Sequence, residues 1–264
     1  MKKPGHIDLK PHTLNGLWLF EGKAMINQKT FQLNKEWTTI FYPEQPSGFA
    51  IMLLGGDKHY INENANFWLD HPSKKQMLES LLTKGYTVFS SYLSGAHWGN
   101  AEAAELAVEL YAFFIRKEIV NERIHIIAEG TGALVLDTIC EKLKDKVRSV
   151  VLLNPILSVK QSYEEEKANK FFLKKMKKEL YQSYHLDDHT FVEWMEAKQD
   201  ITLGNDVPVL IVHVLDKLES NLPLKYQTFI DSHPLADIKY ITPEKRYIIP
   251  YQISSFLKKH EKKL

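Results

Sequence analysis

The feature that most constrains the fold is a regular alternation of short apolar runs with longer amphipathic stretches. The apolar runs are rich in β-branched and aromatic side chains, which is typical of buried strands. They occupy residues 49–54, 86–93, 123–128, 147–155, 207–215 and, more weakly, 237–242. Residues 30–42 add two early strands or a hairpin. Strands that alternate with helical stretches predict βαβ units, and hence an α/β fold with a mostly parallel, doubly wound sheet.

One strand end carries a distinctive turn. The segment IHIIAEGTGALVL, residues 124–136, passes from an apolar strand through a glycine-rich turn into an apolar helix. A nucleophile elbow has this order, and it needs small residues two before and two after the nucleophile because strand and helix backbones approach closely there. Ala128 and Gly132 meet that need around Gly130. We therefore predict that Gly130 occupies the nucleophile position, where it has no side chain to attack with.

The stretch around this turn, residues 49–157, resembles the α/β-hydrolase superfamily, close to its small bacterial esterase- or lipase-like members. Those proteins commonly carry Gly-x-Ser-x-Gly before an aliphatic helix, where this chain has AEGTGAL at residues 128–134. The resemblance implies an α/β-hydrolase fold with a helical cap insertion. It also implies that the turn is a degenerate nucleophile elbow.

Two further loops carry the resemblance. LLGGDKH, residues 53–59, matches the oxyanion-hole loop usually written His-Gly-Gly, with Leu54 in place of the histidine. GAHWGNAEA, residues 95–103, resembles a Trp-Gly-Asn signature that precedes the helix before the elbow in some members. Both loops follow predicted strands, and such sheets bind ligands at the carboxyl ends of their strands. The residues that we expect to line a pocket are Gly55, Gly56, Asp57, His97, Trp98 and Glu129.

The resemblance also implies a triad in the chain order nucleophile, acid, histidine. Asp216 follows the strand at 207–215 and stands where the retained acid would be. The histidine should follow the last strand, but that loop has the sequence PEKRYIIP, residues 243–250. His233 precedes the last strand and His260 lies in the terminal helix. Loss of the nucleophile or the base typically costs about 10⁶ in rate, so we expect the usual mechanism to be absent.

Two replacements for the missing groups stay open at this point. Thr131 is the nearest hydroxyl and is a weak alternative nucleophile, since no base is evident beside it. Glu129 and Asp216 could together activate a water molecule, because paired carboxylates can divide the roles of acid and base. His185 and His189 have helical spacing, but a surface pair is the simpler interpretation. We therefore predict no metal site and no cofactor.

Length and composition set the remaining expectations. The 264 residues suit one domain, residues 1–264, with the cap insertion at about 158–200. The net charge of +1 gives no electrostatic footprint for nucleic acid. No apolar run approaches the roughly 18–20 residues of a membrane span, and the basic start leads into no apolar signal region. A single cysteine, Cys140, fits a reducing compartment, so we expect a cytoplasmic, bacterial protein.

The amphipathic stretch at residues 169–184 has two interpretations. It could be a lid that lies on a membrane surface, with apolar residues on one side and lysines on the other. It could equally be a cap helix packed over the edge of the sheet. We favour the cap helix, because three glutamates directly upstream, residues 164–166, offset the lysines.

Three functional hypotheses follow. The first is a catalytically degenerate hydrolase, a pseudoenzyme, that keeps its pocket for a small molecule or a protein partner. The alternative is an active hydrolase of carboxylic esters or related acyl substrates with a nonstandard nucleophile or base. The third is a partner-binding protein whose pocket is filled by side chains such as Trp98 or Tyr247. We favour the first, because Gly130 and the missing late histidine remove two members of the triad.

Overall fold

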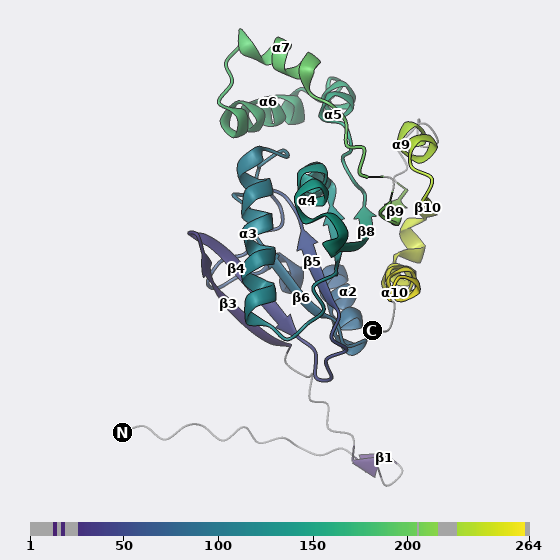
Figure 1. Ribbon diagram of the computed structural model, residues 1–264. Helices are drawn as coiled ribbons and strands as arrows, with labels where there is room; N and C mark the ends of the chain where they lie inside the picture. Colours follow the sequence, from purple (N-terminus) through teal and green to yellow (C-terminus); the bar gives the residue numbers. More distant parts are fainter. Residues whose placement is uncertain (1–12, 15–16, 19–25, 205, 216–225, 262–264) are drawn as a thin grey trace.

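The computed structural model describes residues 13–14, 17–18, 26–204, 206–215 and 226–261 (Figure 1). A short antiparallel ladder joins β1 (Thr13–Leu14) to β2 (Leu17–Trp18). The other described strands form one eight-stranded sheet. From edge to edge it consists of β10 (Ala236–Ile241), β9 (Val209–Val214), β8 (Val147–Leu153), β7 (Ile124–Glu129), β5 (Ala50–Leu54), β6 (Thr87–Ser91), β4 (Glu36–Tyr42) and β3 (Asn27–Leu33).

The sheet is parallel except at one edge. There β4 runs antiparallel to both β6 and β3. The turn between β3 and β4 is Asn34–Lys35, whose φ angles of 50° and 69° are those that a two-residue type I′ hairpin requires. Of the two possibilities for residues 30–42, the structure has the hairpin. The six predicted strands from residue 49 onward are all present, which confirms the predicted fold class.

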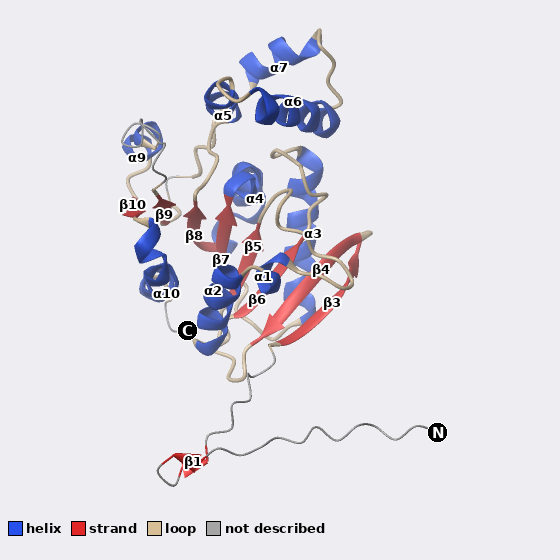
Figure 2. Ribbon diagram, turned by 180° about the vertical axis from the view of Figure 1, so that it is seen from behind, coloured by secondary structure: helices blue, strands red, loops and turns tan. Residues whose placement is uncertain are grey.

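Helices cover both faces of the sheet (Figures 1 and 2). On one face lie α3 (Ala101–Lys117) and α4 (Leu136–Leu143), and on the other lie α2 (Pro72–Thr83) and α10 (Ile249–Lys259). Each face has its own cluster of buried apolar side chains. All five residues of β5 are buried, as expected for a strand covered on both sides. The shorter helices are α1 (Phe67–Asp70), α9 (Gln227–Ser232), η2 (Lys144–Lys146) and η3 (Pro243–Ile248).

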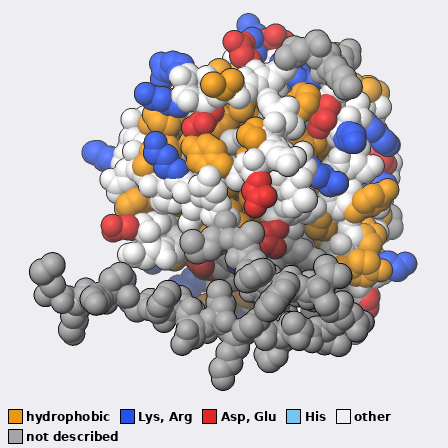
Figure 3. Space-filling view, turned by 90° about the horizontal axis from the view of Figure 1, so that it is seen from below, with side chains coloured by type: hydrophobic (Ala, Val, Ile, Leu, Met, Phe, Trp, Pro, Cys, Tyr) orange, Lys and Arg blue, Asp and Glu red, His pale blue; other side chains and the backbone are white. Residues whose placement is uncertain are grey.

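Three helices stand where the insertion was predicted. They are α5 (Val159–Glu166), α6 (Lys170–Tyr184) and α7 (Thr190–Ala197), and they lie beyond the carboxyl ends of the strands (Figure 1). The α6 helix buries Met176 and Leu180, while Phe171 and Phe172 are exposed. The opposite end of the molecule carries Lys and Arg interspersed with Asp and Glu (Figure 3).

The predicted strand–turn–helix segment differs from expectation in one respect. The turn after β7 continues as a 3₁₀ helix, η1 (Gly130–Val135), and the α-helix begins only at Leu136. No side chain caps the start of η1. The first residues after β7 lie beside the loop that follows β5. This loop and the turn after β7 together form the candidate site.

Candidate functional site

The turn after β7 has the geometry of a tight strand-to-helix elbow. Gly130 lies at its apex with a φ of +56°, in the left-handed region that favours glycine. A Cβ atom built on Gly130 would meet no other heavy atom within 4 Å, so the position of a side chain at residue 130 is open space. A Cβ built on Gly132 would instead lie 2.5 Å from the carbonyl oxygen of Leu54. The backbone contact expected two residues after the apex is therefore present.

The space at Gly130 belongs to a cavity of about 360 Å³. Its floor is made by the turn after β7 and by the loop after β5, and its far wall is made by α5 and α6. The apolar part of the lining consists of Ala96, Trp98, Ile156, Phe172 and Met176. The charged part consists of Asp57, Lys58, Glu165, Glu166, Lys175 and Glu179. Trp98 thus lines the cavity, and its side chain does not fill it.

The loop after β5 folds back so that the side chain of His59 contacts the backbone of Gly56. The backbone N–H of Gly56 donates a hydrogen bond to His59 Nδ1 at 3.0 Å. A Cβ on Gly55 would collide with the His59 ring, so glycine is needed for the ring to lie here. In a hydrolase, an amide of this loop and the amide after the nucleophile form the oxyanion hole. Here the amide of Gly56 already has a partner.

Glu129, the last residue of β7, lies between two basic side chains. Its Oε1 accepts a hydrogen bond from Lys74 Nζ at 2.6 Å, and its Oε2 lies 3.3 Å from His59 Nε2. Burial alone would raise the pKa of Glu129, but the contact with His59 and the charge of Lys74 outweigh it and hold the pKa below its ordinary value. Glu129 is therefore a paired carboxylate and a poor base for activating water.

Thr131 follows the apex and lies against the loop after β5. A Cβ on Gly56 would collide with the Thr131 hydroxyl oxygen, so this hydroxyl packs directly on the Gly56 backbone. Thr131 lines the cavity together with Gly130. The cavity also exposes His59, but both ring nitrogens of that histidine face other groups. The arrangement gives Thr131 no base among the described residues.

His97 lies beneath the cavity floor. It is 1% exposed, its Nε2 bonds the Gly55 carbonyl at 2.8 Å, and its Nδ1 accepts from the Gly99 backbone N–H at 3.0 Å. Burial lowers the pKa of His97. Because both ring nitrogens bond backbone groups, His97 holds two loops together and offers neither nitrogen to a ligand.

The α6 helix is tied to the cavity rim by side-chain contacts. Lys175 Nζ lies 2.8 Å from Asp57 Oδ2 and 3.3 Å from Glu179 Oε1. The Trp98 indole N–H donates to Glu179 Oε2 at 2.8 Å. The Tyr184 hydroxyl donates to the Trp98 carbonyl at 2.8 Å. These contacts join α6 to the loops after β5 and β6, so the cavity has a fixed wall on this side.

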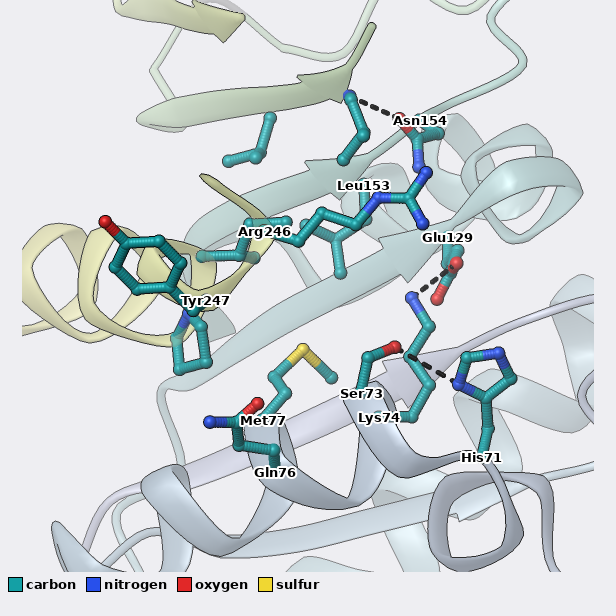
Figure 4. A pocket seen from close by; sticks show the side chains of 14 residues that line it. His71, Ser73, Lys74, Gln76, Met77, Glu129, Leu153, Asn154, Arg246 and Tyr247 are labelled. Atoms are coloured by element: carbon teal, nitrogen blue, oxygen red, sulfur yellow. Dashed lines mark hydrogen bonds and ion pairs between the residues drawn. The ribbon is translucent and has the colours of Figure 1, made fainter. Parts of the chain in front are cut away.

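The loop after β10, where the triad histidine was expected, contributes a positively charged side chain to the site instead. η3 follows β10, and its Arg246 extends across the strand ends toward Asn154 and Glu129 (Figure 4). His233 is distant from this arrangement, since its Nε2 bonds the Gly204 carbonyl at 3.0 Å. Asp216, the expected acid, lies outside the described residues.

Sequence reasoning missed His59, Lys74 and Arg246 as parts of the site. In the sequence His59 is only the end of a loop motif, although a histidine three residues after Gly56 can reach back to that amide. Lys74 and Arg246 come from separate segments, and no local pattern connects them to Glu129.

Two properties of the described residues bear on the expectations for a membrane and for a metal. No described helix is long and apolar enough to cross a membrane. Over the same part of the chain, no three His, Cys, Asp or Glu side chains gather in a group that could hold a metal ion.

Comparisons with known proteins identify the fold. No family model matches the sequence, and no curated protein matches it. An esterase from the bacterial hormone-sensitive lipase family aligns with a TM-score of 0.62 and 14% identity, over 90% of this chain and 86% of the other. An epoxide hydrolase from Vigna radiata aligns with a TM-score of 0.57 and 13% identity, over 91% and 100%. A proline iminopeptidase from Mycobacterium smegmatis aligns with a TM-score of 0.55 and 15% identity, over 89% and 98%.

By their names these three proteins act on different bonds, and their structures share one architecture with this chain. The predicted α/β-hydrolase fold is therefore confirmed. At such low identity the likeness extends to the fold alone. The chemistry has to be argued from the site.

Proposed function

We propose that this chain binds a small molecule in the cavity above Gly130 and does not form an acyl-enzyme. The observation that carries the proposal is the apex of the elbow. Gly130 has the backbone conformation of the turn, and open cavity lies where its side chain would begin. The place from which a serine hydroxyl would attack therefore remains accessible to a ligand and supplies no nucleophile.

The surrounding groups support a binding role. An oxyanion hole needs donors that are free to meet the charge that develops in the transition state. The amide of Gly56 is occupied by His59 Nδ1, and the carboxylate of Glu129 is occupied by Lys74 and His59. Gly56 lines the cavity, so a ligand there would meet an amide that already has a partner.

The lining indicates the kind of ligand. Aromatic and aliphatic side chains form the apolar part, and a volume of about 360 Å³ lies within the range of small-molecule sites. At the rim, four carboxylates stand against two lysines, and Lys175 is shared between Asp57 and Glu179. The excess of carboxylates disfavours an anion. We infer a largely apolar ligand that carries no negative charge.

Two measurements test the proposal. The first is the intact mass of the protein after incubation with a fluorophosphonate probe, for which we expect no adduct. A stoichiometric adduct on Thr131 or a serine would overturn the proposal and support the alternative, an ester hydrolase with a nonstandard nucleophile.

The second measurement is binding of N-phenyl-1-naphthylamine, a neutral fluorescent probe, which we expect to brighten in the cavity. Ile156→Trp places a large ring in the lining and should abolish binding. Val192→Trp, at a position on α7 that is 60% exposed, is the matched control and should leave binding unchanged. Failure of the wild type to bind, or equal binding by the Ile156 variant, would contradict the assignment of the cavity.

A further inference from the structure

A second cavity, of about 300 Å³, opens on the other side of Glu129 (Figure 4). The start of α2, the carboxyl ends of β7, β8 and β9, and η3 with the start of α10 form its walls. The cavity above Gly130 shares none of these lining residues. Lys74, Glu129 and His59 therefore form the partition between the two cavities.

Among the side chains that line this second cavity, positive charges outnumber negative ones. Lys74 is neutralised by Glu129, which its ammonium group contacts at 2.6 Å. Arg246 projects into the cavity from η3, and within the described part of the chain no carboxylate forms an ion pair with it (Figure 4). One positive charge is thus left over. The cavity above Gly130 has the opposite balance, with more carboxylates than lysines.

A hydrogen-bond donor of fixed orientation lies beside this cation. Asn154, directly after β8, has a φ of +41°, and its Oδ1 accepts the Val214 backbone N–H at 2.7 Å. Because the oxygen is used in this way, the amide turns its NH₂ group toward Arg246 (Figure 4). A guanidinium and an amide NH₂ side by side are the donors that bind a planar carboxylate.

The lining also has an apolar part, which includes Met77, Leu153, Val212 and Ile249, beside the polar side chains of His71, Ser73, Gln76 and Tyr247. Glu129 stands on the wall and would repel a second negative charge. Both features favour a monoanion with an apolar body over a phosphate dianion. We propose that this cavity binds a small aliphatic carboxylic acid, whose carboxylate is held by Arg246 and Asn154.

The probe for this site is hexanoate, observed by ligand-detected NMR with the full chain. We expect saturable binding that hexan-1-ol does not reproduce. Arg246→Gln removes the charge and should weaken hexanoate binding by at least about tenfold. Lys245→Gln, at the adjacent exposed cation of η3, is the matched control and should leave binding unchanged. Equal losses in the two variants would mean nonspecific attraction and would overturn the site.

Two more variants test the role of Asn154 and the separation of the two cavities. Asn154→Asp keeps an acceptor for the Val214 amide but replaces the donor with a negative oxygen, so it should abolish binding while the protein stays folded. Ile156→Trp blocks the cavity above Gly130 and should leave hexanoate binding intact. Loss of binding in the Ile156 variant, or displacement of hexanoate by equimolar inorganic phosphate, would overturn the assignment. Because the two cavities take probes of different charge, this proposal can fail independently of the first.

Discussion

His59 accepts a hydrogen bond from the backbone of Gly56, with 3.0 Å between Nδ1 and the amide nitrogen. Because Nδ1 is the acceptor, the ring proton lies on Nε2, which faces the Glu129 carboxylate 3.3 Å away. One side chain thus occupies an amide of the predicted oxyanion loop and turns its protonated nitrogen toward the Glu129 carboxylate. The histidine closest to the elbow in the cavity lining is therefore held in a structural role.

This relationship predicts the result of restoring the missing nucleophile. A serine introduced by Gly130→Ser would extend into open space, but neither His59 nor His97 has a nitrogen free to accept its proton. We expect no hydrolysis of p-nitrophenyl butyrate above the rate of a Gly130→Ala control, measured by release of nitrophenolate. Turnover by the serine variant alone would show that a base exists and that His59 or another group can rearrange to serve it.

The elbow also predicts a difference in stability between two glycine substitutions. Gly132→Ala would place its Cβ 2.5 Å from the Leu54 carbonyl oxygen and 2.9 Å from the Gly55 nitrogen, both of them backbone atoms. Such overpacking costs about 1–3 kcal/mol in the free energy of unfolding. Gly130→Ala meets no neighbour and carries only the strain of a positive φ, about 1 kcal/mol.

Urea denaturation of both glycine variants measures these costs. The expected order of stability is wild type, then Gly130→Ala, then Gly132→Ala. The reverse order of the two variants would mean that the close approach of the two loops is absent in solution.

The ion pair at Glu129 predicts that the folding stability decreases at low pH. The pKa of Glu129 in the folded chain lies below its ordinary value of 4.5, so the folded state binds its proton less readily than the unfolded state. The stabilisation is therefore fully present above pH 4.5 and is lost as the pH falls through the folded pKa.

Glu129→Gln removes this titration and leaves Lys74 without its partner. The variant should be less stable than wild type at pH 7, and the difference should shrink as the pH falls below 4.5. Unfolding curves in urea at pH 7, 5 and 4 test this. Glu164→Gln, in an exposed pair with Lys167, is the control, and we expect little change from it at any pH. A constant difference between Glu129→Gln and wild type would contradict the lowered pKa.

Much of the fold could be predicted because its signal is local. The five residues of β5 are all buried, so the run is apolar throughout and is apparent from the sequence. The small residues around Gly130 mark the elbow because the Gly132 backbone touches Leu54. The contacts of Glu129 could not be predicted in this way. Lys74 is 55 residues away from it along the chain and reaches it only because the tertiary fold brings the start of α2 to the carboxyl end of β7.

The start of the helix after the elbow was also beyond sequence reasoning. Apolar periodicity does not distinguish a 3₁₀ turn from the first turn of an α-helix, so the part of η1 from Gly132 onward was predicted as the start of the helix. The sequence did show that the loop after β10, residues 243–250, contains no histidine. The direction of Arg246 depends on how η3 lies against α10, and only the structure provides it (Figure 4).

A buried histidine in the centre of the sheet gives a second pH dependence, separable from that of Glu129. His125 in β7 is fully buried, and its Nδ1 lies 2.8 Å from Ser149 Oγ. Burial, aided by the charge of Arg148, lowers the pKa of His125 from 6.5 to about 3. The unfolded chain therefore takes up a proton below pH 6.5 while the folded chain does not. Folding stability should fall by about 1.4 kcal/mol for each pH unit between these two values.

The window from pH 6.5 to 4.5 separates this effect from that of Glu129, which stays ionised in the folded chain throughout it. His97 and His260, whose pKa values burial also lowers, contribute to the slope in the same window, so the effect of His125 is the difference between variant and wild type. His125→Phe removes the titration and keeps a ring between Phe49 and Tyr86, which both contact the histidine. We expect the slope of the unfolding free energy against pH in this window to decrease by the contribution of one proton. His71→Phe, at an exposed position, is the matched control and should retain the wild-type slope. An unchanged slope for His125→Phe would mean that His125 becomes protonated in the folded chain, which requires water to reach the centre of the sheet.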